Sequence, residues 1–276
     1  MDARAIAERA AALGGEVIRR AGPAGGRPDV KGVAGDYVTA VDRESEAAVA
    51  AFLLEETGIP VLGEEGTGRG ALRGAGEAPE GAGAPPERAW IVDPLDGTTN
   101  FVHGFHAVGV SVALLEDGRP VVGAVHAPFL GETWSAASGE GCWVRRPDGT
   151  ARRARVSDLP VQRAVVATGF PFRRKQLLER YLAMLRRALE RFEDLRRPGA
   201  ASLDLAWVAS GVFEGFFELA LAPWDVAAGG LLIQEAGGVV TDWTGGDGWL
   251  SGDILAGSPA VHEELLRLAG EVAAGP

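Results

Sequence analysis

The residues with the clearest chemical potential in this sequence are two aspartates that follow a short apolar segment. Residues 89–92 have the length and composition of a short buried strand. Asp93 and Asp96 come next, and then Gly97 and Thr98-Thr99, residue types that open a helix and leave backbone N–H groups without helical partners. Carboxylate oxygens bind hard divalent cations, and a helix start attracts phosphate. The segment therefore predicts a site for a cation and a phosphate together.

Such a string on its own is also compatible with an ordinary capped turn. Two further motifs accompany it: Gly63-Glu64-Glu65-Gly66 precedes it, and Pro223-Trp224-Asp225 follows, with Gly237-Gly238 eleven residues beyond. The combination covers nearly the whole chain and resembles the inositol monophosphatase family of magnesium-dependent, lithium-sensitive phosphatases. The run Thr168-Gly169-Phe170-Pro171-Phe172 is most like that of bacterial inositol monophosphatases.

The resemblance implies a metal site with two or three Mg²⁺ ions. Bridging cations would make the phosphorus of an ester more open to attack by water. Thr98, hydrogen-bonded to Asp42, would orient the attacking water together with Glu64, so the implied catalytic residues are Glu64, Thr98 and Asp42. The implied metal ligands are Glu64, Asp93, the backbone carbonyl of Leu95, Asp96 and Asp225.

The resemblance also implies a substrate site. The phosphate would lie on backbone N–H groups at the helix start. The implied substrate-contacting residues are Asp96, Gly97, Thr98, Gly199, Ala200, Ala201, Glu218 and Asp225. Lys31 would lie on a mobile loop over the site. The chain departs from the family pattern at Gly66, where many members carry a small hydroxyl, and in a Gly/Pro-rich insertion over 66–88. Neither departure removes an implied metal ligand.

Composition limits the partners and the location. A net charge of −11 makes nucleic acid an unlikely main partner, whereas bound cations would still allow a phosphorylated substrate. Because Cys142 is the single cysteine, an internal disulfide is excluded. We therefore expect Cys142 to pack in the core and the protein to lie in a reducing compartment. No apolar run reaches the length of a membrane span and no signal peptide opens the chain, so we expect a cytoplasmic protein that binds no membrane. The family's habit implies a homodimer.

Apolar periodicity places the elements that must position these residues. Helices are expected over 3–21, from Asp42 onward, and over 98–103, 176–191, 199–209, 224–235 and 259–272. Strands are expected over 59–62, 89–92, 108–115, 120–126, 132–136, 141–146, 164–168, 213–221, 239–243 and 254–256. Pro94 should end the central strand, and Asp117-Gly118 should turn a hairpin. The helix over 176–191 should bury Leu178, Tyr181, Leu182, Leu185 and Leu189.

These elements divide into an α+β half over 1–150, with an antiparallel sheet and the metal motifs, and an α/β half over 151–276 that completes the site. The pattern agrees with the layered α-β-α-β-α sandwich that the resemblance implies, the fold of inositol monophosphatase and fructose-1,6-bisphosphatase.

The function that the resemblance implies is Mg²⁺-dependent hydrolysis of a small sugar or cyclitol phosphate, with myo-inositol 1-phosphate as the leading substrate. Relatives with these motifs prefer fructose 1,6-bisphosphate, 3′-phosphoadenosine 5′-phosphate or histidinol phosphate. A bisphosphatase needs extra cations, which 173–175 could supply. An alternative from another class is a binding partner of the transcription machinery, for which the arginine-rich segment 186–197 is the candidate surface. His103 and His106 are more typical of packed or solvated residues, and Asp204 of a structural one.

Overall fold

The computed structural model describes residues 2–22, 29–30, 37–66 and 86–275. Lys31 and most of the insertion over 66–88 lie outside these ranges, so the predictions that concern them remain predictions. Among the described residues, two short strands, β1 (Asp29–Val30) and β2 (Tyr37–Val38), form an antiparallel pair. The element order ends with the long helix α7 (Pro259–Ala274).

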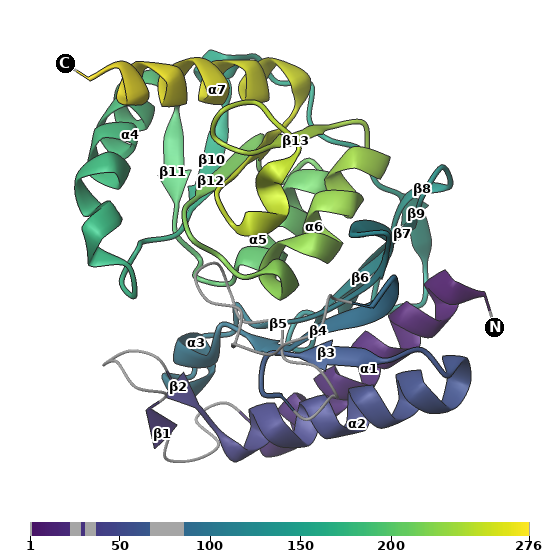
Figure 1. The fold of residues 1–276 in the computed structure, drawn as a ribbon. Coiled ribbons are helices and arrows are strands. Elements are labelled where there is room, and N and C mark those ends of the chain that lie inside the picture. The colour runs from purple at the N-terminus through teal and green to yellow at the C-terminus, as the bar shows by residue number, and fades with distance from the viewer. Residues whose placement is uncertain (1, 23–28, 31–36, 67–85, 276) are drawn as a thin grey trace.

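Two long helices open the chain and cover one face of a large sheet (Figure 1). Helix α1 (Ala3–Ala21) matches the predicted range and is capped by Asp2, which accepts from the Ala5 N–H at 2.7 Å. Helix α2 (Ala40–Thr57) begins with a capping box of Thr39 and Asp42. Apolar side chains of both helices form a core with the sheet beneath them, so the helices are held by packing as well as by their caps.

The large sheet is made of seven strands in the part of the chain that the structure describes, in sequential order. The strands are β3 (Val61–Gly63), β4 (Arg88–Asp96), β5 (Gly109–Glu116), β6 (Arg119–Ala127), β7 (Glu132–Ala137), β8 (Gly141–Arg145) and β9 (Ala151–Arg153). β3 is parallel to β4, and the other pairs are antiparallel. The hairpin at Asp117-Gly118 is confirmed. β9 was not predicted.

The prediction that Pro94 ends the central strand is wrong. Strand β4 continues to Asp96, and the ladder with β5 shifts between Asp93, which pairs with Ser111, and Asp96, which pairs with Gly109. This irregularity accommodates a proline, which has no N–H for a ladder bond. Both aspartates therefore lie on one strand, on either side of a local distortion.

The small sheet has five strands among the described residues, in the order β11-β10-β12-β14-β13. They are β10 (Val165–Thr168), β11 (Asp194–Arg196), β12 (Gly215–Glu218), β13 (Val239–Thr241) and β14 (Ile254–Gly257). β10 is parallel to β11 and β12, whereas β14 is antiparallel to β12 and β13. β11 is a second polar edge strand that was not predicted.

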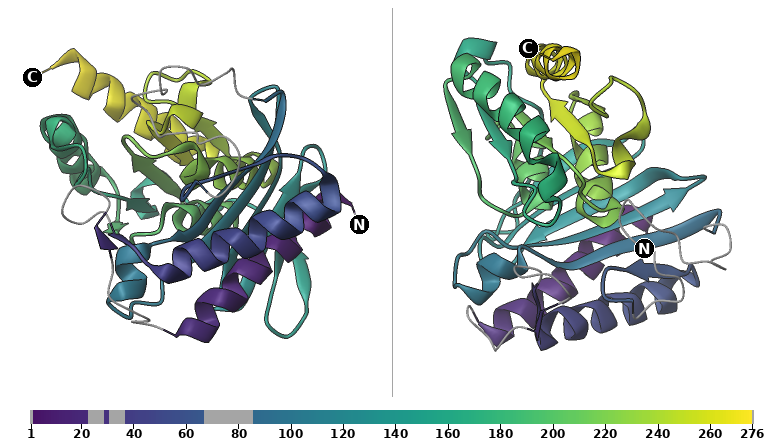
Figure 2. Two further views of the ribbon diagram at one scale, coloured as in Figure 1. Left: turned by 60° about the horizontal axis from the view of Figure 1, so that its bottom comes forward. Right: turned by 60° about the vertical axis from the view of Figure 1, so that its left-hand side comes forward.

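Helices α5 (Ala201–Ala209) and α6 (Pro223–Glu235) lie between the two sheets, and α4 (Leu178–Arg191) and α7 cover the outer face of the small sheet (Figures 1 and 2). The order of layers is thus helices, large sheet, helices, small sheet, helices. This is the α-β-α-β-α sandwich that was predicted. A continuous apolar core between the sheets surrounds α5 and α6 and fixes both helices.

The buried face of α4 differs from the prediction. Tyr181 is buried as expected and Leu185 partly so, but Leu178, Leu182 and Leu189 are 43%, 44% and 63% exposed. Tyr181 is joined instead by the other buried residues Met184 and Ala188. This stripe packs toward α7 and the small sheet, and the three leucines lie on the neighbouring stripe.

None of the helices within the described ranges combines the length and the apolar character that a membrane crossing requires.

Candidate functional site

Three carboxylates meet where β4 ends and α6 begins. Asp93 and Asp96 come from β4, and Asp225 lies in the first turn of α6. One oxygen of each carboxylate lies within 4.8 Å of the others. The start of α6 is tied to the large sheet by the Ser111 hydroxyl, which donates to the Trp224 carbonyl at 2.9 Å. The structure therefore brings together three of the acidic residues predicted as metal ligands.

Each of these carboxylates is oriented by donors from its surroundings. Asp93 Oδ1 accepts from the Leu95 N–H at 3.0 Å, and Asp225 Oδ2 accepts from the Ala222 N–H at 2.7 Å. Asp96 Oδ2 accepts from both the backbone N–H and the hydroxyl of Ser202, at 2.7 and 2.6 Å. A carboxylate whose rotation is fixed in this way is prepared to hold a ligand without further ordering.

Burial and mutual repulsion raise the pKa of all three carboxyls. The pKa of Asp93 lies well above its ordinary value because of burial, followed by the charges of Glu64, Asp96 and Asp225. Burial, with the neighbouring carboxylates, raises the pKa of Asp225 to about 7. Burial also raises the pKa of Asp96 to about 6, against the Ser202 hydrogen bonds that lower it. A divalent cation would relieve this repulsion, so the donor set fits a hard metal such as Mg²⁺.

Glu64 lies beside this group at the end of β3. Its backbone N–H donates to the Val92 carbonyl at 3.2 Å, which holds the end of β3 against β4. Its charge raises the pKa of Asp93, Asp96 and Asp225, so the half-buried side chain is electrostatically coupled to all three. Its carboxylate is nevertheless not part of the tight three-residue cluster.

Thr98 and Asp42 are in contact, although they come from different elements. Thr98 begins the short helix α3 (Thr98–Val102), and its hydroxyl lies 3.1 Å from Asp42 Oδ1 and 3.2 Å from the Leu95 carbonyl. Asp42 is 1% exposed, and its other oxygen accepts from the Thr39 N–H and hydroxyl at 2.8 and 2.6 Å. The capping box of α2 thus holds the carboxylate that faces Thr98.

The backbone segment predicted to contact the substrate lies next to the start of α3. Gly97 has a left-handed backbone (φ 88°), and a Cβ there would lie 2.8 Å from the Ala107 carbonyl and 3.3 Å from the Ala200 side chain. The Asn100 amide donates to the carbonyls of Ala107, Pro198 and Gly199, at 2.8, 2.9 and 3.3 Å. Asn100, which sequence reasoning missed, therefore holds the segment that leads into Ala200 and Ala201.

Glu218 forms another part of this region at the end of β12. Its carboxylate presses against Gly169, where a Cβ would lie 2.0 Å from Oε1. Burial and then the charge of Asp225 raise the pKa of Glu218 to about 8, against the charge of Arg197, which lowers it. Glu218 is therefore close enough to the carboxylate cluster to interact with it electrostatically.

Other chemically notable residues lie outside the three-carboxylate cluster. Cys142 is fully buried, and burial raises the pKa of its thiol to about 12, so it is the inert core residue that was predicted. His103 is exposed, and His106 stacks on Phe129 at 4.8 Å. Asp204 is 1% exposed, and its Oδ1 is without a hydrogen-bond partner among the described residues.

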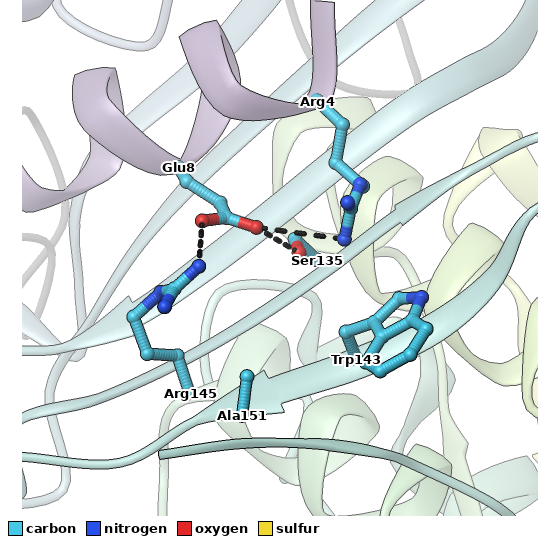
Figure 3. A pocket seen from close by; sticks show the side chains of 6 residues that line it. All are labelled: Arg4, Glu8, Ser135, Trp143, Arg145 and Ala151. Atoms are coloured by element: carbon cyan, nitrogen blue, oxygen red, sulfur yellow. Dashed lines mark hydrogen bonds and ion pairs between the residues drawn. The ribbon is translucent and has the colours of Figure 1, made fainter. Parts of the chain in front are cut away.

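A separate hollow of about 230 Å³ lies between α1 and the last strands of the large sheet (Figure 3). It is lined by Arg4, Glu8, Ser135, Trp143, Arg145 and Ala151. Glu8 lies between the two arginines, 3.7 Å from Arg4 and 3.3 Å from Arg145, and accepts from the Ser135 hydroxyl at 2.6 Å. Glu8 pairs with both arginines, and Arg4 also lies 3.9 Å from Glu140, so this hollow ties α1 to the sheet and offers no counterpart to the carboxylate cluster.

Comparison with known proteins agrees with this geometry. Residues 2–274 match the model of the inositol monophosphatase family. The Nus factor SuhB of Pseudomonas aeruginosa is 42% identical over 270 residues, 95% of this chain and 93% of that protein. The putative Nus factor SuhB of Neisseria meningitidis serogroup B is 42% identical over 236 residues, 84% of each chain.

Solved structures show the same fold. The extragenic suppressor protein SuhB of Bartonella henselae has a TM-score of 0.84 and 34% identity, covering 97% of this chain and 98% of that one. An IMPase of Thermotoga maritima has a TM-score of 0.81 and 28% identity, covering 99% of both chains. With a family match over almost the whole chain and its carboxylate motifs gathered at one place, the protein belongs to the inositol monophosphatase family.

Proposed function

We propose that the protein is a Mg²⁺-dependent phosphomonoesterase that hydrolyses myo-inositol 1-phosphate to inositol and phosphate. The observation that carries this proposal is the cluster of Asp93, Asp96 and Asp225, in which one carboxylate oxygen of each residue lies within 4.8 Å of the others. Family membership supports the class of reaction. Glu64 and the Leu95 carbonyl complete the proposed ligand set for two or three ions.

The residues around this cluster suit hydrolysis by water. When bound, Mg²⁺ supplies Lewis-acid polarisation of the phosphoryl group and lowers the pKa of a bound water. The Thr98 hydroxyl has one proton, and Asp42 Oδ1 lies 3.1 Å from it. With that proton directed to Asp42, the oxygen of Thr98 can accept a hydrogen bond from the attacking water, which Glu64 orients from the other side. The N–H groups of Gly97 and Thr98 would hold the phosphate.

The leaving alcohol would be bound by groups from the other side of the site. Asp96, Asp225 and Glu218 can accept from hydroxyls, and the backbone at 199–201 lines the same region. Because these groups come from β4, α5, β12 and α6, we also propose that residues 1–150 supply most metal ligands and residues 151–276 complete the substrate pocket.

Release of phosphate from a panel of esters tests the proposal. With Mg²⁺ present, we expect turnover of myo-inositol 1-phosphate above that of fructose 1,6-bisphosphate, 3′-phosphoadenosine 5′-phosphate and histidinol phosphate, and inhibition by Li⁺. Chelation of the metal should abolish turnover, because the clustered carboxylates would then repel the charged ester instead of holding the ions that polarise it. The absence of phosphate release from every ester would contradict a phosphatase, and a different best substrate would correct only the substrate.

One positively charged side chain, that of Arg197, favours the bisphosphatase alternative. Arg197 is exposed next to the 199–201 segment, with its guanidinium 5.3 and 5.5 Å from the ring centres of Phe170 and Phe172. Among the described residues, no carboxylate lies within ion-pair distance of it. It faces Glu218, whose pKa it lowers. An arginine held by two rings, with its charge uncommitted, could receive a second phosphate.

Substitution of Arg197 separates the two substrate classes. If a second phosphate binds there, Arg197→Gln should lower kcat/KM for fructose 1,6-bisphosphate about tenfold and leave that for myo-inositol 1-phosphate within about twofold. Arg196→Gln is the matched control, because the neighbouring Arg196 is already paired with Asp194 at 2.5 Å. Equal effects of Arg197→Gln on the two substrates would contradict a role in phosphate selection.

The names of the relatives favour a second candidate, an association with the transcription machinery. The arginine-rich segment 186–197 does not favour nucleic acid as the partner, because four of its arginines already form ion pairs. The pairs are Arg186–Glu190, Arg187–Glu271, Arg191–Glu264 and Arg196–Asp194. A protein partner is therefore the form of this role that we propose. Failure of purified bacterial RNA polymerase complexes to bind the protein in a pull-down would contradict it.

We also propose a homodimer. Phe105 and Val212 are 56% and 55% exposed, and they line a hollow of about 400 Å³ with Trp207 and Phe213. The lining is mostly apolar, and it also includes Arg196 and Arg197. A second copy of the chain would remove this apolar surface from water. Light scattering that returned only the 28.7 kDa mass of one chain would contradict the dimer.

A further inference from the structure

Helix α5 begins without a capping side chain of its own. Its N-cap residue is Ala200, which forms no side-chain cap hydrogen bond. Asp96, at the end of β4 in the large sheet, acts as the cap instead, because its Oδ2 accepts from the Ser202 N–H at 2.7 Å. The carboxylate that lies in the metal cluster is therefore also the group that satisfies the start of α5.

The hydroxyl of Ser202 adds a second bond to the same oxygen. Ser202 is fully buried, and its Oγ donates to Asp96 Oδ2 at 2.6 Å. Two donors that converge on one oxygen from different directions fix both the position and the rotation of the carboxylate. A serine at this position does more than an alanine could, because the backbone N–H alone leaves rotation about the Cβ–Cγ bond less restricted.

The large sheet leaves space for this hydroxyl. Gly109 pairs with Asp96 across the ladder between β4 and β5, and a Cβ at Gly109 would lie 2.7 Å from Ser202 Oγ. The backbone of Gly109 is not in the left-handed region. The absence of a side chain there is therefore explained by the close approach of Ser202 and not by backbone conformation.

We propose that Ser202 is a positioning residue for Asp96, which holds this carboxylate in the orientation that cation binding requires and links cation binding to the placement of the 199–201 segment. The inference rests on the metal site of the proposed function and extends it to a residue outside the ligand set. The two events are thermodynamically linked. A cation that binds the oriented Asp96 carboxylate also stabilises the start of α5 in its observed position, and the observed position of α5 strengthens cation binding to the same extent.

The test is the affinity for Mg²⁺ alone, measured by titration calorimetry without substrate. Ser202→Ala should bind Mg²⁺ about tenfold more weakly than the wild type, the usual effect of losing a residue that orients a ligand. Ser210→Ala is the matched control, because Ser210 lies at the other end of α5 and its hydroxyl donates only to helix carbonyls, 2.9 Å from that of Ala206. This control should retain the wild-type affinity.

A second variant disturbs the hydrogen bond between Ser202 and Asp96 from strand β5. Gly109→Ala should displace the Ser202 hydroxyl and weaken Mg²⁺ binding in the same direction, while thermal unfolding with a chelator reports whether the fold is retained. Equal Mg²⁺ affinities of the wild type and Ser202→Ala would overturn the positioning role. A wild type that binds Mg²⁺ but hydrolyses no ester would overturn the proposed phosphatase and leave the role of Ser202 standing. A wild type that does not bind Mg²⁺ would overturn both.

Discussion

Replacement of Asp93 by asparagine is expected to lower kcat by at least about 100-fold, which corresponds to a loss of about 3 kcal/mol of transition-state stabilisation. Asp93 is 2% exposed, and its pKa is raised by burial and then by the charges of Glu64, Asp96 and Asp225. In the proposed site Asp93 would be a ligand to two cations. An amide would offer one neutral oxygen in place of the two oxygens of a charged carboxylate. Steady-state phosphate release at saturating Mg²⁺ measures the effect.

The same substitution should leave the fold intact and raise the stability of the metal-free protein, because it removes one of several buried like charges. Thermal unfolding with a chelator tests this second expectation. Asp148→Asn is the matched control, since Asp148 is fully exposed in a turn of the large sheet and only holds Thr150. Full turnover by Asp93→Asn would contradict the bridging role, and a large loss of metal-free stability would show that Asp93 is needed for folding.

Without a divalent cation, the protein is expected to become less stable as the pH rises from about 5 to about 8. Asp96 and Asp225 bind their protons more tightly in the folded protein than in the unfolded chain, with pKa values of about 6 and about 7 against 3.8. The folded state therefore carries more protons, and its stability is lost as the pH passes through these raised values. We expect a loss of at least about 2 kcal/mol, or about 4–8 °C in Tm.

Excess Mg²⁺ should remove most of this pH dependence, because a cation compensates the carboxylates in their charged form. At about 100 times its Kd it should add roughly 2.7 kcal/mol of stability at the upper pH. Glu218, whose pKa is raised to about 8, is outside the proposed ligand set, so a residual slope near that pH should persist. Urea unfolding with and without a chelator measures both effects. A metal-free protein that is more stable at the higher pH would contradict the claim that ionisation of the clustered carboxylates destabilises the fold.

The layered fold could be predicted because most of its elements carry their own apolar pattern. Helix α1 was placed at its observed ends, since its buried stripe and the glycine after it are both visible in the sequence. β9 and β11 could not be predicted, because their exposed arginines and aspartate follow no apolar alternation and only backbone pairing makes them strands. The exposed leucines of α4 misled the prediction because burial there depends on what α7 covers.

The acidic residues of the site could be predicted from three motifs, but the contacts that position them could not. Asn100 and Ser202 directly follow predicted site segments, but their roles could not be predicted, because these roles follow from which carbonyl or carboxylate lies opposite each side chain. The glycine at position 109, directly opposite Asp96 in a strand, is the one sequence signal that could have suggested a close approach at this point.

The joint between Ser111 and the Trp224 carbonyl has a consequence for the order of events on the ribosome. Asp93 and Asp96 emerge early, together with the strands around them, whereas Asp225 emerges only when most of the polypeptide has been synthesised. The complete three-carboxylate cluster therefore does not exist while the first sheet forms. The cluster is completed only when α6 packs against the large sheet, where the Ser111 hydroxyl holds the Trp224 carbonyl.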